Sequence, residues 1–189
     1  MRFNNHSKLE GSHAFMSPSS YHWVNYDEQK MDASIFSHFS ARRGTELHDL
    51  AQKAIRLGVK LPDTEETMCK YVNDCIGFRM TPEQTLFYSP NCFGTADAIG
   101  FSTVKKKLRI FDLKTGITKV KVTQLEVYAA LFCLEYNFKP TEIEMELRIY
   151  QNDEVQVFEG DPLEVSRIMS QIVIYDRRID ELRMEAYGA

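Results

Sequence analysis

Apolar residues recur at helical spacing in the first part of the chain. Positions three and four apart predict a helix from about Ala33 to Leu57, which Gly58 would end. A second helix is predicted over "TEETMCKYVNDCIGF", with Asp63 or Thr64 as its N-cap. The inward positions expected for the first helix are Phe36, Phe39, Leu47, Leu50, Ala51 and Ile55.

The apolar period then shortens to two, which is typical of strands. A polar turn, "TVKKK", separates the second of the expected strands from the third. Three strands are therefore predicted, over "QTLFYS", "CFGTADAIGFS" and "KLRIFDLKT".

The remaining pattern adds helices on either side of two further strands. A helix with a strong apolar stripe is expected over residues 122–138, and a last amphipathic helix begins at Asp161-Pro162. Two alternating strands, "EIEMELRIY" and "EVQVFEG", flank an Asn152-Asp153 turn. This order predicts an α/β fold with a mixed sheet, as a single domain over residues 16–189 after a flexible N-terminal segment, 1–15.

Composition narrows the class of protein. The 189 residues are 43% hydrophobic and 26% charged, and the formal charge of -4 provides no overall attraction to nucleic acid or anionic membrane. No apolar run approaches a membrane span and no signal-peptide core is visible, so we expect no membrane association and a cytoplasmic location. The four cysteines lack CxxC spacing, which favours buried thiols, with a zinc or iron–sulfur site as the alternative.

Candidate chemistry is concentrated in "IFDLKTG", where Asp112 and Lys114 lie two residues apart and so share a strand face. A turn centred between Val104 and Lys105 would place Asp97 directly opposite Asp112, and opposed like charges destabilise a sheet. A divalent cation such as Mg²⁺ would compensate them. An ion pair at a strand end is the alternative, and a one-residue register slip would separate the two acids.

Four motifs carry a family resemblance. The segments 94–97 ("GTAD") and 112–116 ("DLKTG") resemble the paired acid and D-x-K motifs of the PD-(D/E)xK nuclease superfamily. Upstream, "GTELH" resembles the helix histidine of the branch that contains the RecB nuclease domain and viral recombination exonucleases. Downstream, "QLEVY" is similar to the Q-x-x-x-Y helix of that branch, and all four follow its order.

The resemblance implies a restriction-endonuclease-like core, a central mixed β-sheet flanked by helices. It implies a sequence-nonspecific DNA exonuclease that uses Mg²⁺ or Mn²⁺ in viral or mobile-element recombination or replication. Lys114 would assist the attacking water, while Gln124 and Tyr128 would position the lysine and the DNA backbone. Glu83 is an auxiliary metal residue in this interpretation, and the metal ligands would be His48, Asp97, Asp112 and the Leu113 carbonyl.

The resemblance also implies partners. DNA would contact Tyr128 and a basic set, and a single-strand-annealing recombination protein would be a second partner. Because no cysteine follows Cys133, the iron–sulfur signature of CRISPR-associated relatives is missing and we expect no cluster. An endonuclease of the same fold, or a fold that binds DNA or protein without cutting, remains open, as does a core role for His48. The basic DNA-binding set is Arg42, Arg43, Lys119 and Lys121.

Overall fold

The computed structural model describes residues 7–9, 14–118 and 120–188. The chain divides into two compact units, Met1–Thr45 and Glu46–Ala189. The flexible segment predicted for residues 1–15 falls mostly outside the described residues, and the single domain over 16–189 stays a prediction.

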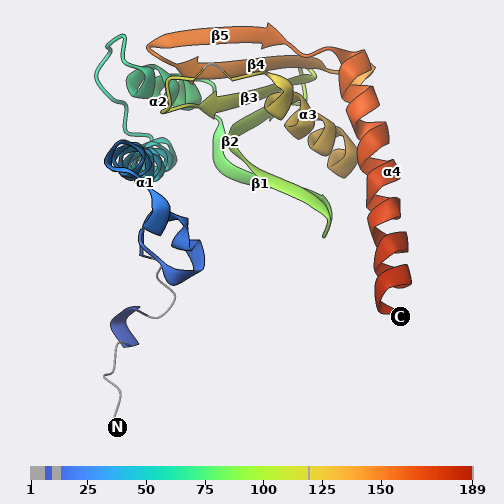
Figure 1. The fold of residues 1–189 in the computed structure, drawn as a ribbon. Helices are drawn as coiled ribbons and strands as arrows, with labels where there is room; N and C mark the ends of the chain where they lie inside the picture. Colours follow the sequence, from blue (N-terminus) through green and yellow to red (C-terminus); the bar gives the residue numbers. More distant parts are fainter. Residues whose placement is uncertain (1–6, 10–13, 119, 189) are drawn as a thin grey trace. The chain divides into compact units, whose positions relative to one another are not determined.

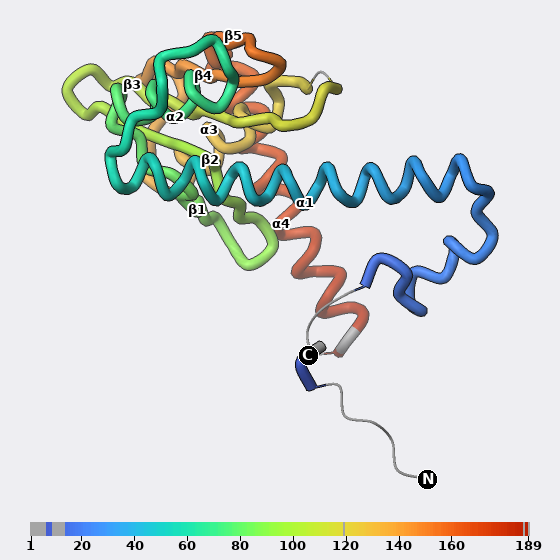
Figure 2. Tube along the Cα trace, turned by 90° about the vertical axis from the view of Figure 1, so that its left-hand side faces the viewer, coloured from blue at the N-terminus to red at the C-terminus, as the bar shows by residue number. Residues whose placement is uncertain are grey.

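The first unit contains short 3-10 turns and the beginning of a long helix. These turns are η1 (Ser7–Leu9) and η2 (Pro18–Asn25), and the helix is α1 (Glu28–Leu57). Figure 2 traces α1 as one continuous helix. It begins earlier than predicted because Asp27 Oδ1 accepts a hydrogen bond from the Lys30 amide at 2.8 Å.

The burial of α1 differs from the prediction. Phe36, Phe39 and Leu50 are exposed, whereas Ala51 and Ile55 are buried in a core that also contains residues of α2 and the sheet. Helical spacing identifies a possible apolar face, but it does not show which turns of a long helix another element covers.

The second unit is built on a five-stranded sheet with the order β1-β2-β3-β4-β5 (Figure 1). Strands β3 and β4 are parallel and the other neighbours are antiparallel, so the predicted mixed sheet is confirmed. The parallel pair requires a crossover, which contains helix α3. The strands are β1 (Thr81–Ser89), β2 (Cys92–Ser102), β3 (Lys107–Leu113), β4 (Glu144–Gln151) and β5 (Glu154–Glu159).

Helices flank both faces of this sheet, which explains why β3 is buried on both sides. Leu108 and Ile110 pack in a core with α3 and α4, while Phe111 and Leu113 pack in a second core with α1 and α2. The α/β prediction is confirmed, whereas the restriction-endonuclease-like fold stays a prediction. The remaining elements are α2 (Thr67–Gly77), α3 (Thr123–Tyr136), η3 (Pro140–Glu142) and α4 (Pro162–Tyr187).

Two helix starts show how local and distant residues share the capping. Asp161 caps α4 as predicted, because its side chain accepts a hydrogen bond from the Leu163 amide at 2.9 Å. The cap predicted for α2, Asp63 or Thr64, was wrong, because the helix begins at Thr67. The Thr67 amide donates a hydrogen bond to Asp153 Oδ1 at 2.8 Å. Asp153 belongs to the turn between β4 and β5, where both central residues have positive φ, as in type I′ hairpins.

Within the described residues, no helix combines the length and the apolar character needed to cross a membrane. Cys69, Cys75 and Cys133 are buried as predicted, while Cys92 is partly exposed; all four are free thiols.

Candidate functional site

The β2–β3 hairpin has the register that the sequence predicted. Ala98 pairs with Phe111, and the pairing continues in step to the turn. Asp97 and Asp112 are the next residues in this register, at the point where the regular pairing ends. Both side chains are largely buried, and Asp112 is 3% exposed. The hairpin therefore holds two opposed carboxylates in the interior of the sheet.

A third carboxylate lies in the same row. Pro82 and Gln84 of β1 pair with the two neighbours of Asp97 in β2, so Glu83 stands opposite Asp97. Glu83 has a φ of 50°, and the strand pairing skips it. The row therefore crosses three adjacent strands and consists of Glu83, Asp97 and Asp112.

His48 of α1 lies next to this row. Its Nδ1 atom is 3.6 Å from Asp97 Oδ2, and that oxygen also accepts a hydrogen bond from the Leu113 amide at 2.8 Å. His48, Glu83 and Asp97 each offer one ligand atom, and these atoms lie within 4.8 Å of one another. The predicted ligand His48 and the auxiliary residue Glu83 thus meet at Asp97. The Leu113 side chain is buried, and the role of its carbonyl stays a prediction.

Lys114 connects the acidic row to α3. Its Nζ atom is 3.0 Å from Asp112 Oδ2, and it donates a hydrogen bond to Gln124 Oε1 at 3.0 Å. The predicted shared face of Asp112 and Lys114 is confirmed by this ion pair. Lys114 is thus the cationic partner of Oδ2, although the angles of this contact fall outside those of a regular hydrogen bond.

Burial and mutual repulsion disfavour ionisation of the two central acids. The pKa of Asp112 is raised first by burial and then by the charge of Asp97, and Lys114 opposes this rise. The pKa of Asp97 is also raised by burial, although the Leu113 amide, His48 and Lys114 favour its charged form. The positive charge around the row is therefore too small to offset the negative charge of its carboxylates.

Tyr128 contacts the strand that carries Asp97. Its hydroxyl donates a hydrogen bond to the Thr95 carbonyl at 2.6 Å, and it lies one helical turn after Gln124. A Cβ atom at Gly94 would lie 3.2 Å from Cε1 of the tyrosine ring. The glycine of "GTAD" thus lets the ring approach the strand, and burial raises the pKa of the tyrosine hydroxyl.

The predicted DNA-binding residues belong to different parts of the chain. Lys121 is exposed in the loop before α3, and Lys119 lies outside the described residues. Arg42 and Arg43 are exposed on the part of α1 that belongs to the first unit. Lys107, the last residue of "TVKKK" and the first of β3, forms an ion pair with Glu146 at 3.0 Å. The electrostatic track for DNA stays a prediction.

Comparisons of the chain with protein-family models, with curated proteins and with solved structures found no match. The resemblance to PD-(D/E)xK nucleases therefore rests on the four motifs alone. Their residues His48, Asp97, Asp112, Lys114, Gln124 and Tyr128 gather in one region, by contacts of β2, β3, α1 and α3.

The sequence did not indicate one buried neighbour of the site, Tyr71. Burial raises the pKa of Tyr71, and the charges of Asp97 and Glu83 contribute to the same shift. Tyr71 is 2% exposed on α2, within the predicted second helix. No sequence signal distinguishes a core tyrosine beside carboxylates from any other core tyrosine.

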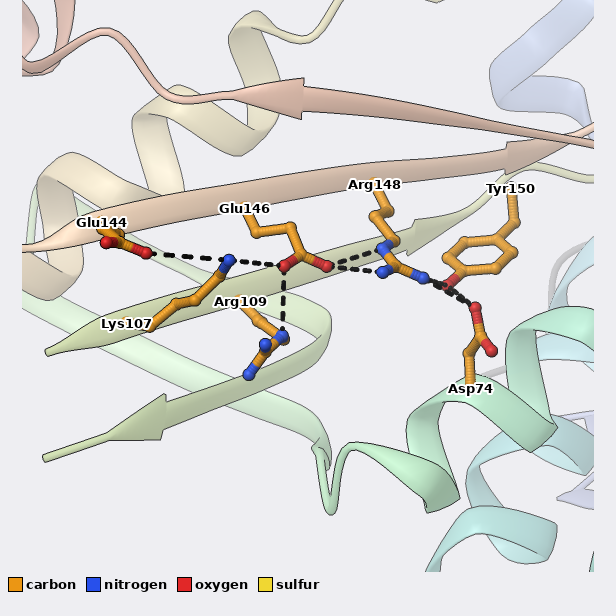
Figure 3. Close-up of polar contacts among 7 residues, drawn as sticks. All are labelled: Asp74, Lys107, Arg109, Glu144, Glu146, Arg148 and Tyr150. Atoms are coloured by element: carbon orange, nitrogen blue, oxygen red, sulfur yellow. Dashed lines mark hydrogen bonds and ion pairs between the residues drawn. The ribbon is translucent and has the colours of Figure 1, made fainter. Parts of the chain in front are cut away.

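A second polar cluster on the same sheet provides a contrast (Figure 3). Arg148 bonds Glu146 and Asp74, and Tyr150 donates a hydrogen bond to the same Asp74 oxygen at 2.7 Å. Acids and bases alternate here, so each carboxylate has a partner, and the pKa of Glu146 is lowered. This cluster has the balance of a structural network, which the acidic row lacks. Its members are Asp74, Lys107, Arg109, Glu144, Glu146, Arg148 and Tyr150.

Proposed function

We propose that this chain is a metal-dependent DNA nuclease, an enzyme that hydrolyses phosphodiester bonds. The observation that carries the proposal is the row of three carboxylates that ends at a lysine. Ionised Glu83, Asp97 and Asp112 carry three negative charges, Lys114 carries one positive charge, and two negative charges remain. One divalent cation would neutralise them.

The residues of the row fit a hard cation. Mg²⁺ and Mn²⁺ prefer carboxylate oxygens, and the row offers three carboxylates on adjacent strands. Glu83, Asp97 and His48, whose ligand atoms lie within 4.8 Å of one another, would hold the ion, and Asp112, the next acid of the row, would complete the set. When bound, such an ion supplies Lewis acidity to a phosphoryl oxygen and lowers the pKa of a coordinated water.

The lysine and the α3 side chains support the reaction type. Gln124 holds the Lys114 ammonium at 3.0 Å, which leaves further N–H groups for a water or a phosphate oxygen. Positioned cationic donors stabilise the charge that develops on phosphate in the transition state. Tyr128, fixed by its hydrogen bond to the Thr95 carbonyl, supports the proposed contact with the DNA backbone.

The resemblance extends this proposal to a sequence-nonspecific exonuclease of recombination or replication. Its partners would be DNA and a single-strand-annealing protein, in the cytoplasm of a bacterial host. Lys121 and the other basic residues would contact phosphates, which carry no direct sequence information. Ends rather than sequences would then select the substrate.

The test is incubation with end-labelled linear DNA and covalently closed circles, with Mg²⁺, Mn²⁺ or a chelator. We expect metal-dependent loss of linear DNA at similar rates for unrelated sequences, while circles survive. Lys114→Ala should slow cleavage by a factor on the order of a hundred. Lys139→Ala is the matched control, because this lysine is 78% exposed and pairs with Glu142.

Four outcomes would contradict or change the proposal. Cleavage that persists with chelator, or equal rates for the two lysine variants, would contradict the assignment of the site. Discrete fragments from circles would identify an endonuclease. DNA binding without cleavage under any metal condition would identify a binding module.

A further inference from the structure

Helix α4 carries an apolar stripe that continues beyond the core of its own chain. Ile168 is buried in the core with α3, but Tyr175, Ile179 and Leu182 are 58%, 41% and 46% exposed. Figure 1 shows α4 running on past α3. A repeat with alternating spacings of four and three residues is the seam of a two-stranded coiled coil. The stripe consists of Ile168, Ile172, Tyr175, Ile179, Leu182 and Ala186.

An open apolar groove adjoins the stripe. It has a volume of about 340 Å³ and lies between α4 and the residues Cys92 and Val127 of β2 and α3. Ile172, Tyr175 and Ile179 line the groove and also belong to the stripe. The apolar surface is therefore continuous from the core to the exposed half of the helix.

One flank of the stripe is held by the chain itself. Asn91, between β1 and β2, donates a hydrogen bond to Asp176 at 3.0 Å and accepts one from Arg183 at 2.7 Å. These bonds fix the second half of α4 to the sheet. The groove lies on this flank, because Asn91 and Asp176 also line it, so the charged side chains left open to a partner helix are those of the other flank, Arg178 and Glu185.

The charges on that flank distinguish between two arrangements. In an antiparallel coiled coil each a position of the heptad faces a d position of the partner. With Ile179 at an a position and Leu182 at the next d position, Ile179 packs against the partner's Leu182. Arg178 then lies beside the partner's Glu185, and two-fold symmetry repeats this attraction. In a parallel pair the same heptad would place Arg178 beside the partner's Arg183, where like charges repel. Arg178 and Glu185 are 52% and 65% exposed, so both side chains can reach a partner.

We propose that α4 is a dimerisation helix, which pairs antiparallel with α4 of a second copy of this chain. The paired helices bury Tyr175, Ile179 and Leu182 and join Arg178 to the partner's Glu185. In the single chain Arg178 instead contacts Glu181 at 3.0 Å and Glu185 at 3.7 Å within its own helix. This surface is independent of the proposed nuclease function, because none of these residues belongs to the acidic row.

Sedimentation velocity of the full chain over a dilution series tests the surface. We expect a monomer–dimer equilibrium that Ile179→Glu weakens at least about tenfold, since a charge in a packed interface centre is costly. Ile174→Glu is the matched control, because Ile174 is 60% exposed on the same helix but outside the stripe. A wild-type chain that stays monomeric at every concentration overturns the proposal, and so does equal weakening by the two variants.

Charge reversal tests the orientation. Arg178→Glu should weaken an antiparallel dimer, and adding Glu185→Arg should restore it. In a parallel dimer Arg178→Glu alone would strengthen association, because the new carboxylate would face the partner's Arg183. That result would overturn the antiparallel arrangement. Helix content from circular dichroism confirms that each variant is folded at the concentrations used.

Discussion

Replacing Asp112 by asparagine is expected to stabilise the metal-free protein at neutral pH. The carboxylate is buried opposite Asp97, and burial and the charge of Asp97 raise its pKa despite the contact with Lys114. Asparagine has nearly the same shape but no charge, so both the desolvation and the repulsion are relieved. Lys114 keeps its hydrogen bond to Gln124 and remains partly exposed to solvent.

The size of this effect follows from opposing terms. Two unit charges about 5 Å apart, the Cβ separation of directly opposed residues, repel by about 3 kcal/mol at an effective dielectric constant of ~20. By the same arithmetic Lys114, at 3.0 Å from Asp112 Oδ2, attracts this carboxylate by about 5.5 kcal/mol, so the charge pairs alone favour ionised Asp112. Burial of the carboxylate, the largest cause of its raised pKa, outweighs that difference. We therefore expect a net gain on the order of 1 kcal/mol in the free energy of unfolding, after the loss of that attraction. For a chain of this size the melting temperature should rise by about 2–4 °C.

The stability difference between Asp112→Asn and the wild type should depend on pH in a predictable direction. Because the pKa of Asp112 is raised on folding, the folded protein binds this proton more tightly than the unfolded chain does. The free energy of unfolding of the wild type thus falls as pH rises from about 3.9, the unfolded value, through the raised folded value. Below this window both states are protonated. The advantage of Asp112→Asn should therefore vanish in acid and reach its plateau above the folded pKa.

If the row binds a metal as proposed, adding Mn²⁺ is expected to make the wild type more stable than Asp112→Asn. Mn²⁺ at about a hundred times its dissociation constant should add about 2.7 kcal/mol to the wild type, and far less to a variant that lacks a ligand. Thermal unfolding followed by circular dichroism, in chelator and in Mn²⁺ across this pH range, measures both effects. Asp49→Asn, at an exposed position, is the control. A less stable Asp112→Asn protein in chelator would refute the claim that burial and repulsion outweigh the attraction of Lys114, and equal stabilisation by Mn²⁺ would refute the ligand assignment.

Three further substitutions test other parts of the structure. His48→Ala should weaken Mn²⁺ binding in calorimetric titration and barely change the metal-free melting temperature, because this side chain is 29% exposed and lies 3.6 Å from Asp97; a large loss in chelator would indicate a core role instead. Gly94→Ala should cost about 1 kcal/mol in urea unfolding, since the new Cβ would lie 3.2 Å from the Tyr128 ring; unchanged stability would mean that the ring moves aside. Arg148→Ala should cost about 2 kcal/mol by leaving two carboxylates short of a partner, with Mn²⁺ affinity unchanged; altered affinity would link that network to the site.

The strands and their register could be predicted because the necessary information is local. Alternating residues on both sides of "TVKKK" define the β2–β3 hairpin, and the turn position alone sets which residues face each other. The start of α2 could not be predicted in this way. Its first amide is bonded by Asp153, 86 residues later, and no local pattern near Thr67 indicates that partner.

In the candidate site, too, some contacts could be predicted from local sequence and others depend on distant parts of the chain. Opposition of Asp97 and Asp112 followed from one hairpin, and the Lys114–Asp112 contact followed from strand alternation. The position of Glu83 depends on a second strand pairing that is interrupted at that residue. His48 reaches Asp97 only through the packing of α1, so only the motif resemblance indicated it.

Glu83 also shows why the acidic row differs from the charged network of Figure 3. Among the described residues with positive φ other than glycine, it is the one inside a strand, and this backbone conformation costs on the order of 1 kcal/mol. A fold that needed only to pair its charges would gain by relaxing that strand. Around Arg148 that pairing is achieved. In the row, backbone strain, opposed carboxylates and raised pKa values of Asp97 and Asp112 occur together, and a bound cation would relieve the electrostatic part of that cost.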